Sequence, residues 1–159
     1  GIAGDDFGYV KLRLDVAQYF PIGKYIPFLY WDSVVATRIA GEINNDINDD
    51  KIPFFDLARI GGGESVRGYQ YNRFFDENSL FYSLEYRYNI WKFKDYKIDA
   101  TVFFDCGWVF DEVTEFEVGK FKEGYGIGLR LLLPHLTFSC EVAHSDEGTE
   151  FYVKGSPIF

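Results

Sequence analysis

The feature that most constrains the fold is an alternation of apolar and polar side chains with a period of two residues. In the segment 79–91, for example, Leu80 and Leu84 fall on one face, whereas Ser83 and Glu85 fall on the other. Successive side chains of a β-strand point to opposite faces of a sheet, so this period predicts strands and little helix. We expect seven strands, close to Tyr9–Phe20, Tyr30–Ile43, Ser79–Trp91, Lys97–Asp111, Gly124–Leu133, Leu136–Ser145 and Thr149–Phe159.

The length of these segments and the charges within them help to distinguish a transmembrane β-barrel from a soluble β-protein. Their apolar faces run for about ten residues, the length that a tilted strand needs to cross a bilayer, whereas soluble strands usually end after about five or six. The opposite faces carry charges in mid-strand, namely Arg13, Asp15, Arg38, Glu85, Arg87, Asp105, Arg130 and Glu141. A small soluble barrel fills its interior mostly with apolar side chains, so the pattern favours a transmembrane barrel with a polar lumen. A soluble β-barrel or sandwich that binds an apolar ligand also alternates, and it remains an alternative.

The amino-acid composition favours a membrane protein and argues against nucleic-acid binding. Phe, Tyr and Trp make up 20% of the chain, and these side chains favour strands and membrane–water boundaries. With a formal net charge of -9, the chain offers no basic face that could neutralise phosphates. We therefore expect no nucleic acid among its partners. No run of about 18 apolar residues, as a transmembrane helix requires, occurs in the sequence.

The reactive side chains form no recognisable catalytic or metal site. His135 and His144 fall at different strand ends, and no nucleophile motif accompanies them. We expect no enzyme activity, no metal and no cofactor. Cys106 and Cys140 lie on strands separated by a third, about 10 Å apart, whereas bridged Cα atoms lie roughly 4.4–6.8 Å apart. Two free thiols are therefore expected.

One connection is much longer than the others. Short and long connections alternate along the chain, as in outer-membrane barrels, whose periplasmic turns are short. The longest, Asn44–Asn78, far exceeds the roughly 15 residues beyond which loops are usually functional or disordered. Its stretch Ile52–Ile60 is too apolar to stay solvated, so we expect it to pack inside the barrel. Gly61, Gly62 and Gly63 follow and permit a sharp turn, but the Lys-Ser/Thr of a phosphate-binding loop is absent.

Three short motifs then point to one family. They read Val66-Arg67-Gly68-Tyr69 after the glycines, Leu84-Glu85-Tyr86-Arg87 on the next strand, and Phe103-Phe104-Asp105-Cys106-Gly107 on the one after that. Together they resemble the outer-membrane surface-antigen family, the BamA/TamA-type barrel insertases, whose relatives include two-partner secretion translocators and organelle protein-import barrels. The resemblance implies that the loop folds back into the lumen. There Arg67 would meet Glu85 and Asp105, beside the wall-motif residues Phe103 and Gly107.

The end of the chain adds to this resemblance. A last strand with Phe151, Val153 and Gly155 in one phase and a terminal Phe159 resembles the signal by which such barrels are recognised for assembly. Members of the family have sixteen strands and often periplasmic domains. We therefore expect residues 1–159 to be a single β-barrel domain, the C-terminal half of a larger or oligomeric barrel. The other strands would come from a missing N-terminal part or from a second copy.

The sequence thus predicts an all-β protein, a piece of a transmembrane antiparallel β-barrel of the bacterial outer membrane with its long loop folded into the lumen. The resemblance implies a role in the insertion or translocation of proteins. The partners would be outer-membrane lipids and client outer-membrane proteins or periplasmic assembly factors. A barrel that only anchors a fused periplasmic domain is an alternative.

Overall fold

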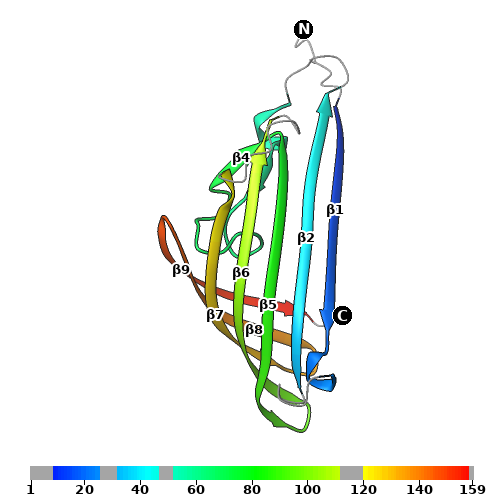
Figure 1. Cartoon of the computed structure of the whole chain (residues 1–159), viewed down its shortest axis with the longest axis vertical. Helices are drawn as coiled ribbons and strands as arrows, with labels where there is room; N and C mark the ends of the chain where they lie inside the picture. Colours follow the sequence, from blue (N-terminus) through cyan, green and yellow to red (C-terminus); the bar gives the residue numbers. More distant parts are fainter. Residues whose placement is uncertain (1–8, 26–31, 47–51, 112–119, 158–159) are drawn as a thin grey trace.

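The part of the chain that the structure describes is all β apart from short 3-10 turns. The structure is a computed structural model and describes residues 9–25, 32–46, 52–111 and 120–157. One antiparallel sheet contains, in spatial order, β1 (Tyr9–Phe20), β2 (Ser33–Asp46), β5 (Asn78–Phe93), β6 (Tyr96–Phe110), β7 (Lys122–Leu132), β8 (Leu136–Ser145) and β9 (Gly148–Pro157) (Figure 1). The remaining elements are η1 (Ile22–Lys24), η2 (Phe54–Asp56) and a hairpin of β3 (Ala58–Ile60) with β4 (Phe74–Asp76).

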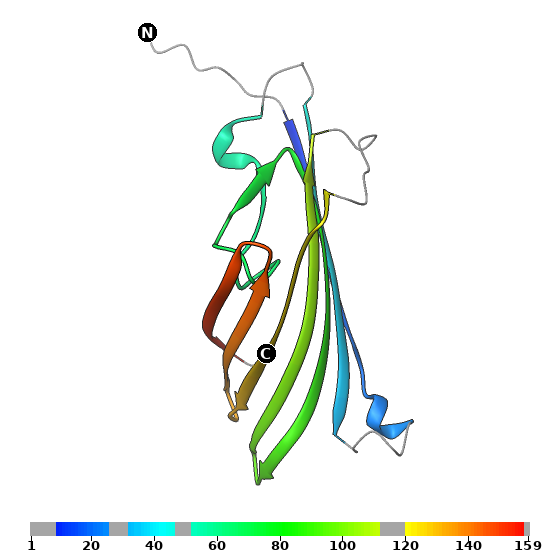
Figure 2. The same cartoon turned by 60° about the vertical axis from the view of Figure 1, so that its left-hand side comes forward.

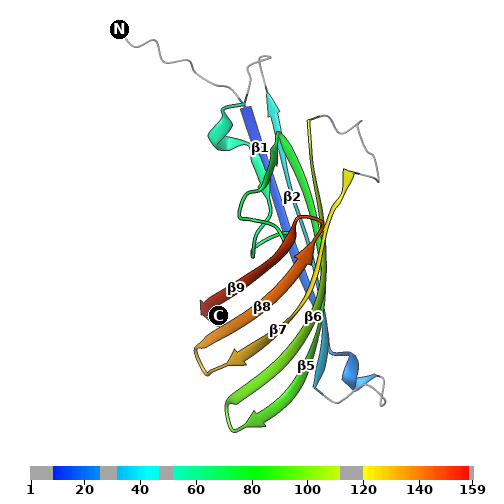
Figure 3. The ribbon, with the colours of Figure 1, turned by 90° about the vertical axis from the view of Figure 1, so that its left-hand side faces the viewer.

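The sheet is strongly curved. Strands β7, β8 and β9 turn away from the direction of β1 and β2, so that the sheet encloses a concave side (Figure 3). Residues 52–77, which we call the lumen loop and which include the β3–β4 hairpin, lie on this concave side (Figure 2). Within the described residues β1 and β9 are the two edges of the sheet and do not pair with each other. The architecture is therefore that of a partial β-barrel.

The seven predicted strands are confirmed, and β1 and β8 have the predicted bounds. Strand β5 extends beyond its predicted ends, to Asn78 and Phe93, because its pairing with β6 continues almost to the turn that joins them. The pattern does not predict the hairpin in the lumen loop, since strands of three residues are too short to display a period. The start expected for the second strand, Tyr30, lies outside the described residues.

The two faces of the sheet have opposite chemistry. On the convex face large apolar side chains are exposed, with Val102 at 57% and Leu129 at 54%. On the concave face polar and charged side chains are buried, including Thr101, Asp105 and Glu141. This reverses the arrangement of a water-soluble barrel, in which apolar side chains fill the inside. The alternation therefore places an apolar belt outside and a polar lumen inside, as the sequence predicts.

Two further observations concern the membrane and the cysteines. Among the residues that the structure describes, no helix combines the length and the apolar character needed to cross a membrane. Cys106 on β6 and Cys140 on β8 are both free, and β7 lies between their strands. The predicted strand order that keeps the two thiols apart is thus confirmed.

Candidate functional site

The tip of the lumen loop is a compact turn built on glycine. Gly61, Gly62 and Gly68 have φ values of 112°, 93° and 100°, in the left-handed region that favours glycine. The Gly61 amide donates to the Ser65 hydroxyl at 2.8 Å, and the Gly62 amide donates to the Val66 carbonyl at 3.1 Å. These bonds curl the tip, so that the segment after it points into the lumen.

Apolar side chains pack the loop against the wall. Ile60, Val66 and Tyr69 form a buried cluster with Phe81 of β5, and Val66 is 0% exposed. A Cβ at Gly107 of β6 would lie 2.6 Å from the Val66 side chain, which is too close for any other residue without a shift. The glycine of the wall motif is therefore explained by the close approach of the loop.

Arg67 lies at the centre of the site. Its Nε and Nη2 donate to the two oxygens of Asp105 on β6 at 2.7 and 2.9 Å, and its backbone amide donates to the same carboxylate at 3.1 Å. Ser83 of β5 contributes to the same group, donating to Asp105 at 2.6 Å and accepting from Arg67 at 3.3 Å. Arg67 is 5% exposed and Asp105 is 0% exposed. A planar guanidinium matches a carboxylate in this two-bond geometry, which a lysine cannot reproduce.

The second carboxylate that binds Arg67 is not the one predicted. Nη1 of Arg67 donates to Glu141 of β8 at 3.2 Å, whereas Glu85 pairs with Arg87 at 3.2 Å. The prediction of Glu85 as a direct partner is therefore wrong. The reason is the register, since Ser83 and not Glu85 stands opposite Asp105 in the β5–β6 ladder. We call Arg67, Asp105, Ser83 and Glu141 the Arg67 cluster.

Phe103 and Gly124 also contact Arg67. The guanidinium carbon lies 3.4 Å from the centre of the Phe103 ring, a close cation–π contact. On β7, a Cβ at Gly124 would overlap the Arg67 carbonyl oxygen, so the backbone of the loop runs directly against this strand. Of the wall motif, Phe103, Asp105 and Gly107 thus all touch the loop.

Strand β9 also holds the loop, through contacts that the sequence motifs do not predict. The Tyr152 hydroxyl accepts from the Gly68 amide at 3.0 Å and donates to the Tyr69 carbonyl at 2.8 Å. Lys154 donates to the Gly63 carbonyl at 2.6 Å and to Glu141 at 2.9 Å. The alternation along the last strand could have indicated these contacts, because Tyr152 and Lys154 are two residues apart and share its inward face. The residues expected to form an assembly signal, Phe151, Val153 and Gly155, lie in the opposite phase, and Phe159 lies outside the described residues.

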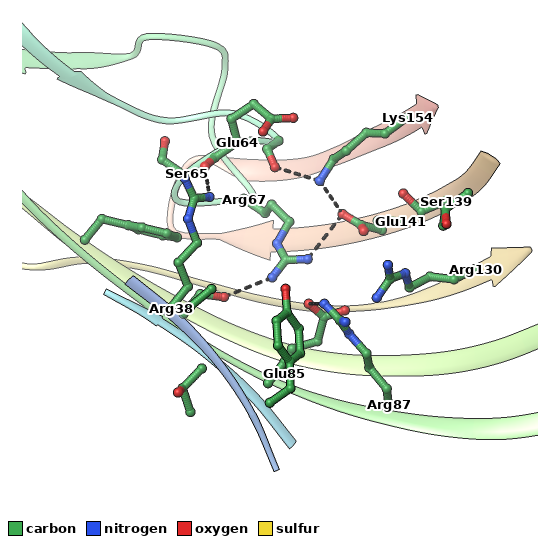
Figure 4. Close-up of a pocket in the computed structure, with 18 of the residues that line it drawn as sticks. Arg38, Glu64, Ser65, Arg67, Glu85, Arg87, Arg130, Ser139, Glu141 and Lys154 are labelled. Carbon is green, nitrogen blue, oxygen red and sulfur yellow. Dashed lines mark hydrogen bonds and ion pairs between the residues drawn. The ribbon is translucent and has the colours of Figure 1, made fainter. Parts of the chain in front are cut away.

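A cavity of about 580 Å³ adjoins the loop (Figure 4). Arg38 of β2 reaches the loop from one side of it and donates to the Glu64 carbonyl at 2.9 Å, while two bonds to Asp15 of β1 hold its guanidinium. Lys154 reaches the loop from the other side (Figure 4). Arg87 and Arg130 also line the cavity. The site is thus a polar lumen that the loop bridges from wall to wall.

The outer end of the loop is held by a tyrosine. The Tyr69 hydroxyl donates to Asp146, in the turn between β8 and β9, at 2.6 Å. This bond holds the pKa of Asp146 below its ordinary value, and burial raises the pKa of Tyr69. Among the described residues no group of three or more His, Cys, Asp or Glu side chains is placed to hold a metal ion. The site is suited to holding a loop in place.

Comparison with known protein families identifies the family of the chain. The family model described as the Omp85 superfamily domain matches residues 1–153. The matched region includes the lumen loop, the Arg67 cluster and every strand of the sheet, with β9 matched as far as Val153.

Proposed function

The chain belongs to the Omp85 superfamily of outer-membrane assembly and transport proteins, and we propose that it forms the C-terminal part of a barrel that inserts or translocates proteins. Members of the family are non-enzymatic assembly and transport proteins, and its bacterial members act at the outer membrane. The particular role of this chain is our inference from its lumen.

The observation that carries the proposal is the position of the Arg67 cluster. A barrel that serves only as an anchor needs an apolar outer surface and a filled interior. Many different side chains could fill such an interior. Here a glycine-rich loop is instead held by two buried carboxylates on different strands, Asp105 and Glu141, through a single guanidinium. Such a loop has a defined position in the lumen and can be released as a unit. A movable plug of this kind suits a barrel through which, or along which, other chains pass.

The open edges of the sheet determine which partners we propose. Unpaired backbone groups in lipid cost several kcal/mol each, so β1 and β9 need neighbours in a membrane. We propose that the remaining strands come from another part of the barrel or from a second copy of the chain. Lipid would cover the convex apolar face. Client proteins or periplasmic assembly factors would bind at the two rims of the barrel.

The C-terminal strand is the proposed recognition element for assembly. Phe151 and Val153 are 75% and 79% exposed on the convex side of β9, and Gly155 lies in the same phase. An exposed row of this kind on an edge strand can be bound by an assembly factor before the barrel closes.

The proposal is tested by reconstitution. The full-length protein is placed in lipid vesicles, and a small outer-membrane barrel is diluted into them from urea as the client. Folding of the client is followed by the mobility of unheated samples in gels. We expect faster folding than in empty vesicles, a slower rate with Arg67→Ala, and an unchanged rate with Arg73→Ala. Arg73 is the matched control, since it lies in the same loop and forms an exposed ion pair with Glu147.

Failure of the wild-type protein to accelerate client folding would remove the support for insertion. If conductance of unfolded chains across the bilayer were also absent, the remaining function would be that of an anchor for a fused domain. A protein that stayed soluble without detergent would contradict the membrane assignment altogether.

A further inference from the structure

Two side chains of the edge strand β9 make hydrogen bonds to the backbone of the lumen loop. Its Tyr152 hydroxyl contacts the backbone of Gly68 and Tyr69, and its Lys154 ammonium contacts the carbonyl of Gly63. All three contacts are made to backbone atoms of the loop, so they depend on where the loop lies and not on its side chains.

The loop that receives these contacts is fixed independently of β9. Arg67 ties it to β6 through Asp105, and Arg38 of β2 donates to the Glu64 carbonyl from the opposite side of the cavity. Both β2 and β6 are paired along both of their sides. As long as these two contacts are intact, the loop has one position in the lumen against which the position of β9 can be set.

Among the described strands β9 pairs only with β8, so the end of β9 that lies away from the short β8–β9 turn has no second strand to hold its register. The register of an edge strand can slip, and a slip by one residue would turn Tyr152 and Lys154 toward the convex face. A slip by two residues would keep them inside but move them by about 6.8 Å, beyond hydrogen-bond reach. The contacts with the loop are therefore compatible with one register only.

From this arrangement we infer that the lumen loop is a register clamp for β9, in which Tyr152 and Lys154 act as positioning residues. Release of the loop and loosening of β9 are then one coupled event, and each promotes the other because coupling free energies are reciprocal. The clamp goes beyond the proposed function, since it operates whether the barrel inserts proteins or only anchors a domain.

The first test uses a native cysteine. Cys140 stands directly opposite Val153 in the β8–β9 ladder, so Val153→Cys should form a disulfide in the native register, with Cys106→Ser present to remove the other thiol. In the full-length protein in detergent, mild oxidation should give near-complete bridging. Adding Tyr152→Phe and Lys154→Met should lower the bridged fraction, whereas the matched Tyr125→Phe on the convex face should not. Equal bridging in all three proteins would overturn the clamp.

The second test leaves the lumen residues intact, so it does not depend on a variant that could fail to fold. Hydrogen exchange of the Gly68 amide is compared between the oxidised and reduced forms of the Val153→Cys, Cys106→Ser protein. If loosening of β9 releases the loop, the bridged form should exchange more slowly, by about fivefold for one hydrogen bond held closed. Equal exchange in the two forms would show that the loop and β9 open separately, and the inference would fail.

Discussion

Arg67→Ala is the substitution that most directly tests the structure of the site. Arg67 makes four side-chain hydrogen bonds, two to Asp105 and one each to Glu141 and Ser83. Removing one partner of a buried ion pair costs about 3–5 kcal/mol, because the other charge is left uncompensated. Glu141 would keep Lys154 at 2.9 Å, so the loss falls mainly on Asp105. We therefore expect the free energy of unfolding to decrease by about 3 kcal/mol, at the lower end of this range.

Arg67→Lys separates geometry from charge. A lysine keeps the positive charge but presents a single ammonium, so it cannot bind both oxygens of Asp105 and also reach Glu141. Hydrogen bonds to charged groups contribute about 1.5–3 kcal/mol each. We therefore expect the loss of one such bond to lower the free energy of unfolding by about 1.5–3 kcal/mol. This decrease should lie below that of Arg67→Ala.

Urea unfolding in lipid vesicles, followed by tryptophan fluorescence, measures both effects. Arg73→Ala is the control, because its ion pair with Glu147 is exposed and such pairs contribute about 0–1 kcal/mol. A double-mutant cycle of Arg67→Ala with Asp105→Asn should give a coupling energy above about 1 kcal/mol. If Arg67→Ala destabilised the protein no more than Arg73→Ala, the reasoning from a buried, paired guanidinium would be refuted.

Three further predictions follow from the packing of the sheet. Leu129→Arg on the convex face should destabilise the barrel in vesicles by about 2–4 kcal/mol, and a neutral effect on urea unfolding would contradict contact with lipid. Gly124→Val should cost about 1–3 kcal/mol because its side chain overlaps the Arg67 carbonyl, and an unchanged unfolding midpoint would mean that the loop does not run against β7. Intact mass under non-reducing conditions should show both Cys106 and Cys140 as thiols, and an intramolecular bridge would disprove the strand order.

Much of the fold could be read from local patterns. The period of two residues determined which segments become strands, and it also determined which side chains share a face, because both properties depend only on neighbours along the chain. The apolar stretch before the glycines indicated a loop packed inside, and Ile52, Ala58 and Ile60 are indeed buried, whereas Phe54 and Phe55 are 62% and 75% exposed. The contact between Arg67 and Asp105 was implied by the family resemblance, and the phase of its strand put Asp105 on the inward face.

The remaining contacts of the site depend on tertiary structure. Glu85 and Ser83 share the same face of β5, and only the register of β5 against β6 decides that Ser83 stands opposite Asp105. Glu141 and Lys154 are far from the lumen loop in the chain and reach it, at Arg67 and at the Gly63 carbonyl respectively, because the sheet curves around the lumen. Curvature and register arise from the pairing of all the strands together, so no single segment carries them. For this reason the sequence alone determined the wall and the loop, whereas only the folded sheet decided which side chains hold them together.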